Sequence, residues 1–213
     1  MQLAGNPISV VYDDHQLFAE SFSVVLERLN LFKSTHIFVS DEQAYLQFLI
    51  QNHDVPIYLF LDYYLPQKNA LSLINETRRI NKKARIIVLS SVSTPSIIKH
   101  ILTYNPNGFL TKSCGVDIVI ACLQVIAEGR AYVCPQIREV INSRLLPNDE
   151  ILFTAREMEM LHYFAQGLTI IETAERTHLS KHTIVAHRRK MMTKARVNSI
   201  TELLAYARNK ELI

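Results

Sequence analysis

Short apolar segments alternate with longer amphipathic segments five times within the first 127 residues, and this alternation constrains the fold more than any other feature. The short segments are rich in Ile, Val, Phe and Tyr, as β-strands are. They cover residues 8–12, 36–39, 57–61, 85–89 and 108–110. The longer segments, with apolar residues at helical spacing, cover residues 16–29, 41–50, 70–80, 96–104 and 116–127. The alternation predicts an α/β domain of flavodoxin-like (βα)5 type, in which helices cover both faces of a parallel five-stranded sheet.

The pattern changes after residue 129, and the last part of the chain is predicted to be all-helical. Thr154 and Glu157 have the spacing of a capping box, as do Thr169 and Glu172, so that each pair marks the start of a helix. Ser180 can cap a third helix, and a fourth is predicted over about 199–208. We therefore predict an α/β domain over residues 1–129, a linker with a short helix over 130–151, and a four-helix domain over 152–213.

Composition indicates a globular protein rather than a membrane protein. Hydrophobic residues make up 48% of the chain, but no apolar run approaches the roughly 18 residues of a membrane span. A basic segment followed by an apolar stretch, typical of a signal peptide, is also missing from the N-terminal sequence. The three cysteines, Cys114, Cys122 and Cys134, form no Cys-x-x-Cys pair, so neither a disulfide framework nor a metal site is expected from them. Free thiols suit the reducing cytoplasm, where we expect the protein to act.

Basic charge is concentrated near the C-terminal end. Residues 153–213 carry 10 Lys and Arg against 6 Asp and Glu, whereas residues 1–152 carry 13 against 14. Six of the cations, and no acidic residue, lie in the stripe from Lys181 to Arg196. Such a stripe is either the footprint of a polyanion or a solvated helix face, and charge alone does not separate these two interpretations.

Acidic, hydroxyl and basic residues that could together form one site follow four of the five predicted strands. They are Asp13 and Asp14 after the first strand, Asp62 after the third, Ser90 and Ser91 after the fourth, and Lys112 after the fifth. In an open parallel sheet, ligands bind at the carboxyl ends of the strands, and in the order 2-1-3-4-5 strands one and three are neighbours. The three carboxylates should therefore converge. Each residue alone fits a turn, a helix cap or a solvated side chain, but their joint occurrence favours a site.

Three converging carboxylates repel one another and need a cation. Clustered hard oxygens favour Mg²⁺, which suits phosphate chemistry. Lys112 supplies a compact positive charge for a phosphoryl oxygen, and a serine hydroxyl offers a hydrogen bond. One carboxylate can be the nucleophile that forms an aspartyl phosphate. The residues thus predict a phosphoryl-transfer site that acts by positioning and charge neutralisation.

Four segments resemble the receiver domains of bacterial response regulators. They are Val-Tyr-Asp13-Asp14-His-Gln-Leu-Phe, Leu61-Asp62-Tyr-Tyr-Leu-Pro66, Ile87-Val-Leu-Ser90-Ser91 and Gly108-Phe109-Leu-Thr-Lys112. The resemblance implies that Asp62 is the phosphoacceptor and a metal ligand. It implies that Asp14 binds Mg²⁺ directly, that Asp13 binds it mostly through water, and that the backbone carbonyl of Tyr64 completes the protein ligands.

The same resemblance implies how a receiver would respond to phosphorylation. Ser90 matches the switch hydroxyl that closes on the phosphoryl group, and Phe109 matches the switch aromatic that rotates inward after it. Lys112 matches the lysine that pairs with the phosphate, and the small Ser91 leaves room for that group.

The loop after Asp62 departs from the family pattern. The family often has Met-Pro-Gly-x-x-Gly, whereas residues 65–70 read Leu-Pro-Gln-Lys-Asn-Ala and lack glycines that would adopt positive φ easily. Tyr64 is large for a position beside the phosphoryl site. We hypothesise that Tyr64 hinders the attacking water and prolongs the phosphorylated state.

Residues 152–213 resemble the C-terminal helix-turn-helix of NarL/FixJ (LuxR-type) regulators. The matching segments are Thr154-Ala-Arg-Glu-Met-Glu-Met-Leu, Ala165-Gln-Gly167-Leu, Leu179-Ser-Lys-His-Thr183-Ile-Val-Ala-His187 and Lys194-Ala-Arg-Val197. A recognition helix buries one face and presents the other to the major groove. The inward stripe is predicted to be Ile184, His187 and Met191, with His187 a packing or hydrogen-bonding residue and not a metal ligand. The outward residues are predicted to be Lys181, His182, Val185, Arg188, Arg189 and Met192.

The resemblance places Val185 and Arg189 where the family reads base edges. Candidates for phosphate contacts, which position without specifying sequence, are Lys181, Thr183, Arg188, Lys190 and Lys194. The family often has Asn where Lys190 stands and Leu-Gly where Ala195-Arg196 stand. The extra cations are expected to raise nonspecific affinity and to steepen its salt dependence.

Together the two resemblances imply a two-component response regulator and not an enzyme. A sensor histidine kinase would phosphorylate Asp62, and the phosphorylated chain would dimerise, bind specific sites on double-stranded DNA and regulate transcription with RNA polymerase as a partner. The dimer face would lie on the fourth helix and fifth strand or on the first and fifth helices. No membrane partner is expected.

Two other interpretations have different consequences. The chain could be a phosphorylation-independent DNA-binding regulator whose receiver serves as a dimerisation or ligand- or protein-binding module; the intact set of site residues argues against this. It could also be a phosphatase with Asp62 as its nucleophile. Haloacid-dehalogenase-type phosphatases have a second Asp two residues after the nucleophile as acid/base, and Tyr64 stands there, which disfavours rapid hydrolysis.

Overall fold

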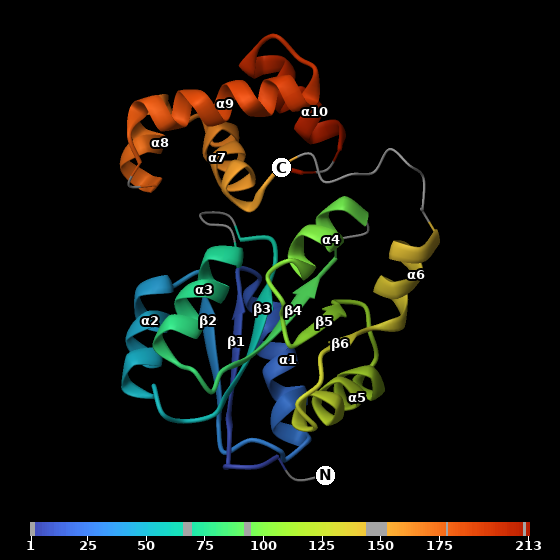
Figure 1. Ribbon diagram of the computed structural model, residues 1–213. Coiled ribbons are helices and arrows are strands. Elements are labelled where there is room, and N and C mark those ends of the chain that lie inside the picture. Colours follow the sequence, from blue (N-terminus) through green and yellow to red (C-terminus); the bar gives the residue numbers. More distant parts are fainter. Residues whose placement is uncertain (1–2, 66–69, 92–94, 144–152, 178, 211) are drawn as a thin grey trace. The chain divides into compact units, whose positions relative to one another are not determined.

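The computed structural model describes residues 3–65, 70–91, 95–143, 153–177, 179–210 and 212–213 (Figure 1). The chain divides into an N-terminal unit that contains all the described strands and a C-terminal unit that contains the helices after residue 153. The strands are β1 (Ile8–Asp13), β2 (Thr35–Val39), β3 (Ile57–Asp62), β4 (Arg85–Ser90), β5 (Gly108–Thr111) and β6 (Tyr132–Val133). The first six helices are α1 (Gln16–Arg28), α2 (Glu42–Gln51), α3 (Ala70–Ile80), α4 (Pro95–Leu102), α5 (Val116–Ala127) and α6 (Pro135–Ser143).

All strands of the sheet are parallel, in the order β2-β1-β3-β4-β5-β6. The order of the first five is the flavodoxin-like order predicted from the sequence. The predicted five-stranded sheet gains β6, whose ladder begins where the Tyr132 N–H donates to the Asn107 carbonyl. A strand of two residues is too short to show a period of its own, so the sequence pattern did not reveal it. Every residue of β1 and β3 is buried, as expected for central strands covered on both faces.

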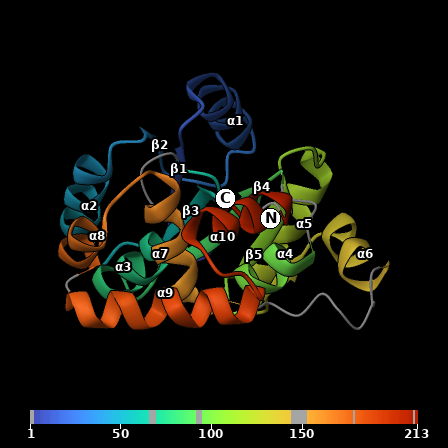
Figure 2. The ribbon, with the colours of Figure 1, turned by 90° about the horizontal axis from the view of Figure 1, so that it is seen from above.

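Helices α1 and α5 pack on one face of the sheet (Figures 1 and 2). The Phe22 ring of α1 meets the Phe60 ring of β3 edge to face, with centroids 5.1 Å apart. Helix α5 comes close to the sheet at Gly108, where a Cβ would lie only 2.8 Å from the Cys122 Sγ. Glycine at this position therefore allows the close packing of α5 on β5.

Helices α2 and α3 lie on the opposite face (Figure 2). Tyr45 of α2 is fully buried, and its ring packs edge to face on Tyr12 of β1 with centroids 5.2 Å apart. The Tyr45 hydroxyl lies 2.6 Å from the Thr77 hydroxyl of α3. This hydrogen bond satisfies two buried polar groups and joins the two helices.

The described part of the C-terminal unit is helical, as predicted. Its helices are α7 (Ala155–Ala165), α8 (Ile170–Thr177), α9 (Lys181–Ala195) and α10 (Ile200–Asn209). Both predicted capping boxes are present: the Thr154 N–H donates to Glu157 at 2.7 Å, and the Thr169 N–H donates to Glu172 at 2.7 Å. Within the described ranges, none of the helices has the length and apolar character needed to span a membrane.

Candidate phosphorylation site and nucleic-acid interface

The predicted acidic residues converge at the carboxyl edge of the sheet. Asp13 ends β1 and Asp62 ends β3, and because Tyr12 pairs with Leu61 in register, the two aspartates lie level on neighbouring strands. The Lys112 Nζ lies 2.8 Å from Asp13 Oδ2 and 2.9 Å from Asp62 Oδ2. The backbone positions this lysine, since the Lys112 N–H donates to the Ser90 carbonyl at 3.0 Å.

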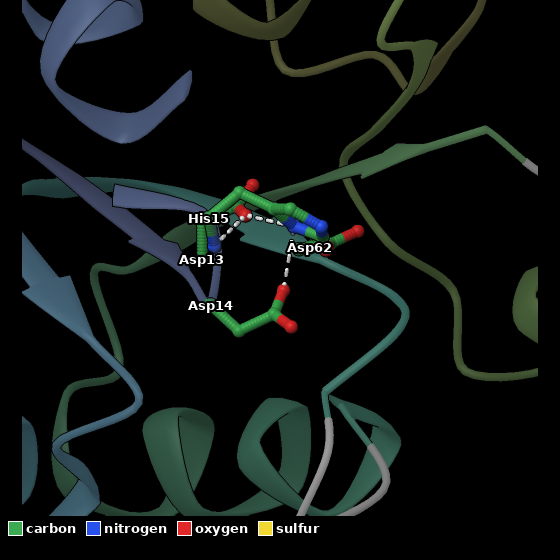
Figure 3. Close-up of side chains that lie close together, drawn as sticks. All are labelled: Asp13, Asp14, His15 and Asp62. Carbon is green, nitrogen blue, oxygen red and sulfur yellow. Dashed lines mark hydrogen bonds and ion pairs between the residues drawn. The ribbon is translucent and has the colours of Figure 1, made fainter. Parts of the chain in front are cut away.

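Asp14 and His15 complete the cluster (Figure 3). Carboxylate oxygens of Asp13, Asp14 and Asp62 and a ring nitrogen of His15 lie within 4.8 Å of one another. The His15 Nδ1 is 2.8 Å from Asp14 Oδ1 and 3.2 Å from Asp13 Oδ1. Sequence reasoning missed His15, although its position directly after the two aspartates was a usable signal.

Burial dominates the electrostatics of the pocket. Only 2% of the Asp62 side chain is exposed, and this burial raises its pKa to about 6 although Lys112 donates a hydrogen bond to it. Burial alone would lower the pKa of the Lys112 ammonium, but its hydrogen bonds to Asp13 and Asp62 outweigh that effect and raise the pKa. One ammonium thus faces two buried carboxylates and a third nearby, Asp14, which leaves the pocket short of positive charge. This donor set fits a hard divalent cation.

Tyr64 lies beside Asp62, the predicted phosphoacceptor. Its backbone N–H donates to Asp62 Oδ1 at 3.3 Å, while its side chain is 43% exposed. The ring is held edge to face against the buried Tyr63 ring, with centroids 5.1 Å apart. The backbone of Tyr64 thus contacts Asp62 while its ring packs on Tyr63, and the effect of Tyr64 on an attacking water stays a prediction.

The remaining receiver residues occupy distinct places. Ser90 is fully buried at the end of β4, and Ser91 is exposed directly after it. Phe109 is fully buried in β5. The sequence analysis did not select Phe18, whose ring lies under the Lys112 Nζ at 4.6 Å from the centroid. Phe18 comes four residues after Asp14, and this spacing could have indicated that its ring lies near the site.

Helix α9 has one buried and one exposed face. Ile184 and Met191 are fully buried, as predicted, and His187 is half-buried. The residues predicted to read bases, Val185 and Arg189, are both exposed. Met192 was predicted to face outward, and this is wrong: it is partly buried against the core of the unit. Helices α7, α8 and α10 all pack on α9, so its inward face is wider than one apolar stripe.

The exposed side of α9 is hollowed and carries most of the predicted DNA contacts. The hollow is lined by His182, Val185, Ala186, Arg189, Lys190, Thr193 and Lys194. Lys181 is also exposed, and Thr183 and Arg188 are half-buried. Cationic and apolar side chains alternate along this face, which can contact both phosphates and base edges.

Lys194 has an intramolecular partner that the sequence did not reveal. Its Nζ lies 2.5 Å from Glu157 Oε2, although the two residues are 37 positions apart. The Glu157 side chain is only 3% exposed. Burial would raise the Glu157 pKa, but hydrogen bonds from Lys194 and from the Thr154 N–H outweigh it and lower the pKa. The predicted phosphate contact is thus also an ion pair between α9 and α7.

Helix α9 ends at a residue in the left-handed conformation. Arg196 has φ 55° and ψ 45°. The Arg196 N–H donates to the Thr193 carbonyl, and the Val197 N–H donates to the Met192 carbonyl at 3.0 Å. This is a Schellman-type helix end, in which glycine is the usual left-handed residue. An arginine is strained there, because its Cβ approaches the backbone.

Two family models match the chain, one for each unit. Residues 9–124, more than half of the chain, match the response regulator receiver domain. Residues 152–207 match the bacterial regulatory proteins of the luxR family. The chain therefore belongs to the response regulators, with a receiver domain followed by a LuxR-family domain.

Relatives share this organisation over nearly their whole length. The Fimbriae Z protein of Salmonella typhimurium is 26% identical over 207 residues, which cover 96% of this chain and 97% of that protein. The transcriptional regulatory protein DegU of Brevibacillus brevis is 25% identical over 213 residues, covering 91% and 89%. RcsB from Salmonella enterica serovar Typhimurium, bound to the promoter rprA in the presence of phosphomimetic BeF3-, has a similar fold, with a TM-score of 0.73, 22% identity and coverage of 94% and 98%.

Proposed function

We propose that a sensor histidine kinase phosphorylates Asp62 and thereby controls dimerisation and sequence-specific DNA binding, which regulates transcription. The observation that carries the proposal is the position of the Lys112 ammonium, within 2.9 Å of carboxylates at the ends of both β1 and β3. A nucleophile and a cation for the transferred group are thus preassembled at the edge where ligands bind. The similarity to RcsB, which was solved on promoter DNA with a phosphoryl mimic, supports the proposal.

In the proposed reaction, an Asp62 carboxylate oxygen attacks the phosphorus of the kinase's phosphohistidine. The P–N bond breaks, and its electron pair leaves with the imidazole. Lys112 exchanges its hydrogen bond to Asp62 for one to a phosphoryl oxygen, which stabilises the added charge. Ser90 is proposed to donate its hydroxyl to the same group, with Phe109 as the accompanying switch residue. The nucleophile must be ionised; burial raises the pKa of Asp62, and a bound cation would favour the ionised form.

Asp13, Asp14 and Asp62, with the backbone carbonyl of Tyr64, are the residues that would hold Mg²⁺. When bound, Mg²⁺ neutralises charge on the phosphoryl oxygens. Its fit rests on the oxygen donors and on the excess of carboxylates over cations in the pocket. Tyr64 stands where a phosphatase would need an acid/base carboxylate, which supports a regulator that keeps its phosphoryl group over an enzyme that turns it over.

For DNA binding we propose that Val185 and Arg189 contact base edges in the major groove. Phosphate contacts are assigned to Lys181, Thr183, Arg188 and Lys190, with Lys194 sharing its ammonium with Glu157, and His182 is a further DNA contact. A two-fold dimer would place two such helices on half-sites about 34 Å apart. We further propose the domain limits 1–129, 130–151 and 152–213, contact with RNA polymerase at promoters, and action in the cytoplasm.

The proposal is tested with the full chain, Asp62→Ala and the control Asp54→Ala, which removes an exposed carboxylate outside the pocket. Each protein is incubated with Mg²⁺ and acetyl phosphate or beryllofluoride. Mass by light scattering and affinity for selected and random DNA are then measured. We expect dimer fraction and specific affinity to rise for the wild type and Asp54→Ala only. Identical behaviour of all three proteins would instead favour a phosphorylation-independent regulator.

A further inference from the structure

The lysine at the proposed phosphorylation site has a third partner besides its two carboxylates. The Lys112 Nζ lies over the face of the Phe18 ring, 4.6 Å from its centroid. An ammonium within about 6 Å of a ring face is attracted by the negative face of the aromatic quadrupole. Only 15% of the lysine side chain is exposed, so water competes weakly with this contact.

The Phe18 ring is held in place by a series of aromatic contacts. It stacks on Phe22 of the same helix, with centroids 5.7 Å apart and an interplanar angle of 12°. Phe22 in turn meets Phe60 edge to face at 5.1 Å. Phe60 is fully buried in β3, two residues before Asp62. The series therefore ties the ring beneath Lys112 to the strand that carries the phosphoacceptor.

We propose that Phe18 is a positioning residue that keeps the Lys112 ammonium in the pocket while its hydrogen-bond partners change. The inference rests on the proposed phosphorylation of Asp62. When an Asp62 oxygen bonds to phosphorus, its carboxylate loses its charge, and Lys112 must turn to a phosphoryl oxygen. A ring face attracts the ammonium without accepting any one of its three N–H groups in a fixed direction. The ammonium can therefore reorient without leaving for solvent.

The test compares side chains of similar bulk with and without an aromatic face. Phe18→Leu and Phe18→Met remove the face, while Phe18→Tyr and Phe18→Trp keep it. The chain has no tryptophan of its own, so Phe18→Trp also supplies a single fluorescent reporter beside the site. Phe48→Leu is the matched control, because Phe48 also belongs to an aromatic cluster, with Phe38 at 5.4 Å, but lies on α2.

Phosphorylation by acetyl phosphate in Mg²⁺ is measured over a range of donor concentrations, with melting temperatures to show that each variant folds. We expect Phe18→Leu and Phe18→Met to lose about three- to tenfold in the second-order rate, the range that a cation–π contact of this kind supports. The two aromatic variants and Phe48→Leu should stay within about twofold of wild type. The Lys112 Cε proton resonances, shifted upfield by the ring, should move downfield in the Leu and Met variants only.

If the wild type is phosphorylated, either of two results overturns the inference. Wild-type rates in folded Phe18→Leu and Phe18→Met would show that the ring does not position Lys112. Equal losses in all four variants would show that only packing matters. A wild type that folds but is not phosphorylated would refute the proposed function itself, and the positioning role with it; the NMR shift would then still report whether the contact exists.

Discussion

Replacing Asp62 by asparagine should stabilise the N-terminal unit at pH 8 in the absence of divalent cations. The native carboxyl has its pKa raised from 3.8 to about 6, chiefly by burial. The folded state thus binds the proton more tightly than the unfolded state does, and stability is lost as pH rises through about 6. A difference of about two pH units at about 1.4 kcal/mol each gives about 3 kcal/mol as an upper limit. Asparagine removes this penalty, and Lys112 keeps its ion pair with Asp13.

The gain should depend on pH in a defined window. The gain in the free energy of unfolding is complete above about pH 6 and declines between pH 6 and pH 4. It disappears below pH 4, where the wild-type carboxyl is protonated in the folded and the unfolded state. Urea unfolding in EDTA, followed by the amide NMR signals of β3, reports on the N-terminal unit alone. Asp54→Asn makes the same charge change at a side chain that is 79% exposed and should alter stability by less than about 0.5 kcal/mol. A loss of stability in Asp62→Asn at pH 8, or an equal gain at pH 4 and pH 8, would refute the reasoning.

Three further substitutions test other parts of the molecule. Tyr64→Asn should speed loss of the phosphoryl group severalfold by opening the site to water, and an unchanged or slower decay of the phosphoprotein would contradict this. Lys190→Asn should weaken binding to all DNA sequences alike and reduce the slope of log affinity against log salt by about 1; an unchanged slope would remove Lys190 from the phosphate contacts. Lys194→Met leaves the buried Glu157 carboxylate without its ammonium and should destabilise the C-terminal unit by about 1–3 kcal/mol in urea unfolding, whereas wild-type stability would show that the ion pair contributes nothing.

The convergence of the acidic residues and Lys112 could be predicted because it depends on backbone topology. The carboxyl ends of parallel strands meet at one edge, so the order of strands alone brings Asp13, Asp62 and Lys112 together. The capping boxes at Thr154 and Thr169 could be predicted for a similar reason, since both partners lie within one helical turn.

Contacts that depend on side-chain packing between distant segments left no comparable signal. The Phe18 ring reaches Lys112 from another element, and Lys194 reaches Glu157 across 37 positions, without any periodic pattern that links them. Met192 was placed on the wrong face because a single stripe of 3.6-residue periodicity underestimates the buried surface of a helix that packs against three neighbours. Burial by several partners is a property of the tertiary structure, not of the helix that carries the residue.

Two requirements conflict at position 196, where Arg196 has a left-handed backbone conformation. Its backbone conformation suits glycine, and a non-glycine residue there costs on the order of 1 kcal/mol. Its guanidinium, in contrast, adds a cation beside the proposed DNA-binding helix. A library randomised at this position should therefore yield glycine when it is selected for heat resistance, and arginine or lysine when it is selected for promoter occupancy. Arg196 would then mark a point where this regulator has exchanged folding stability for affinity.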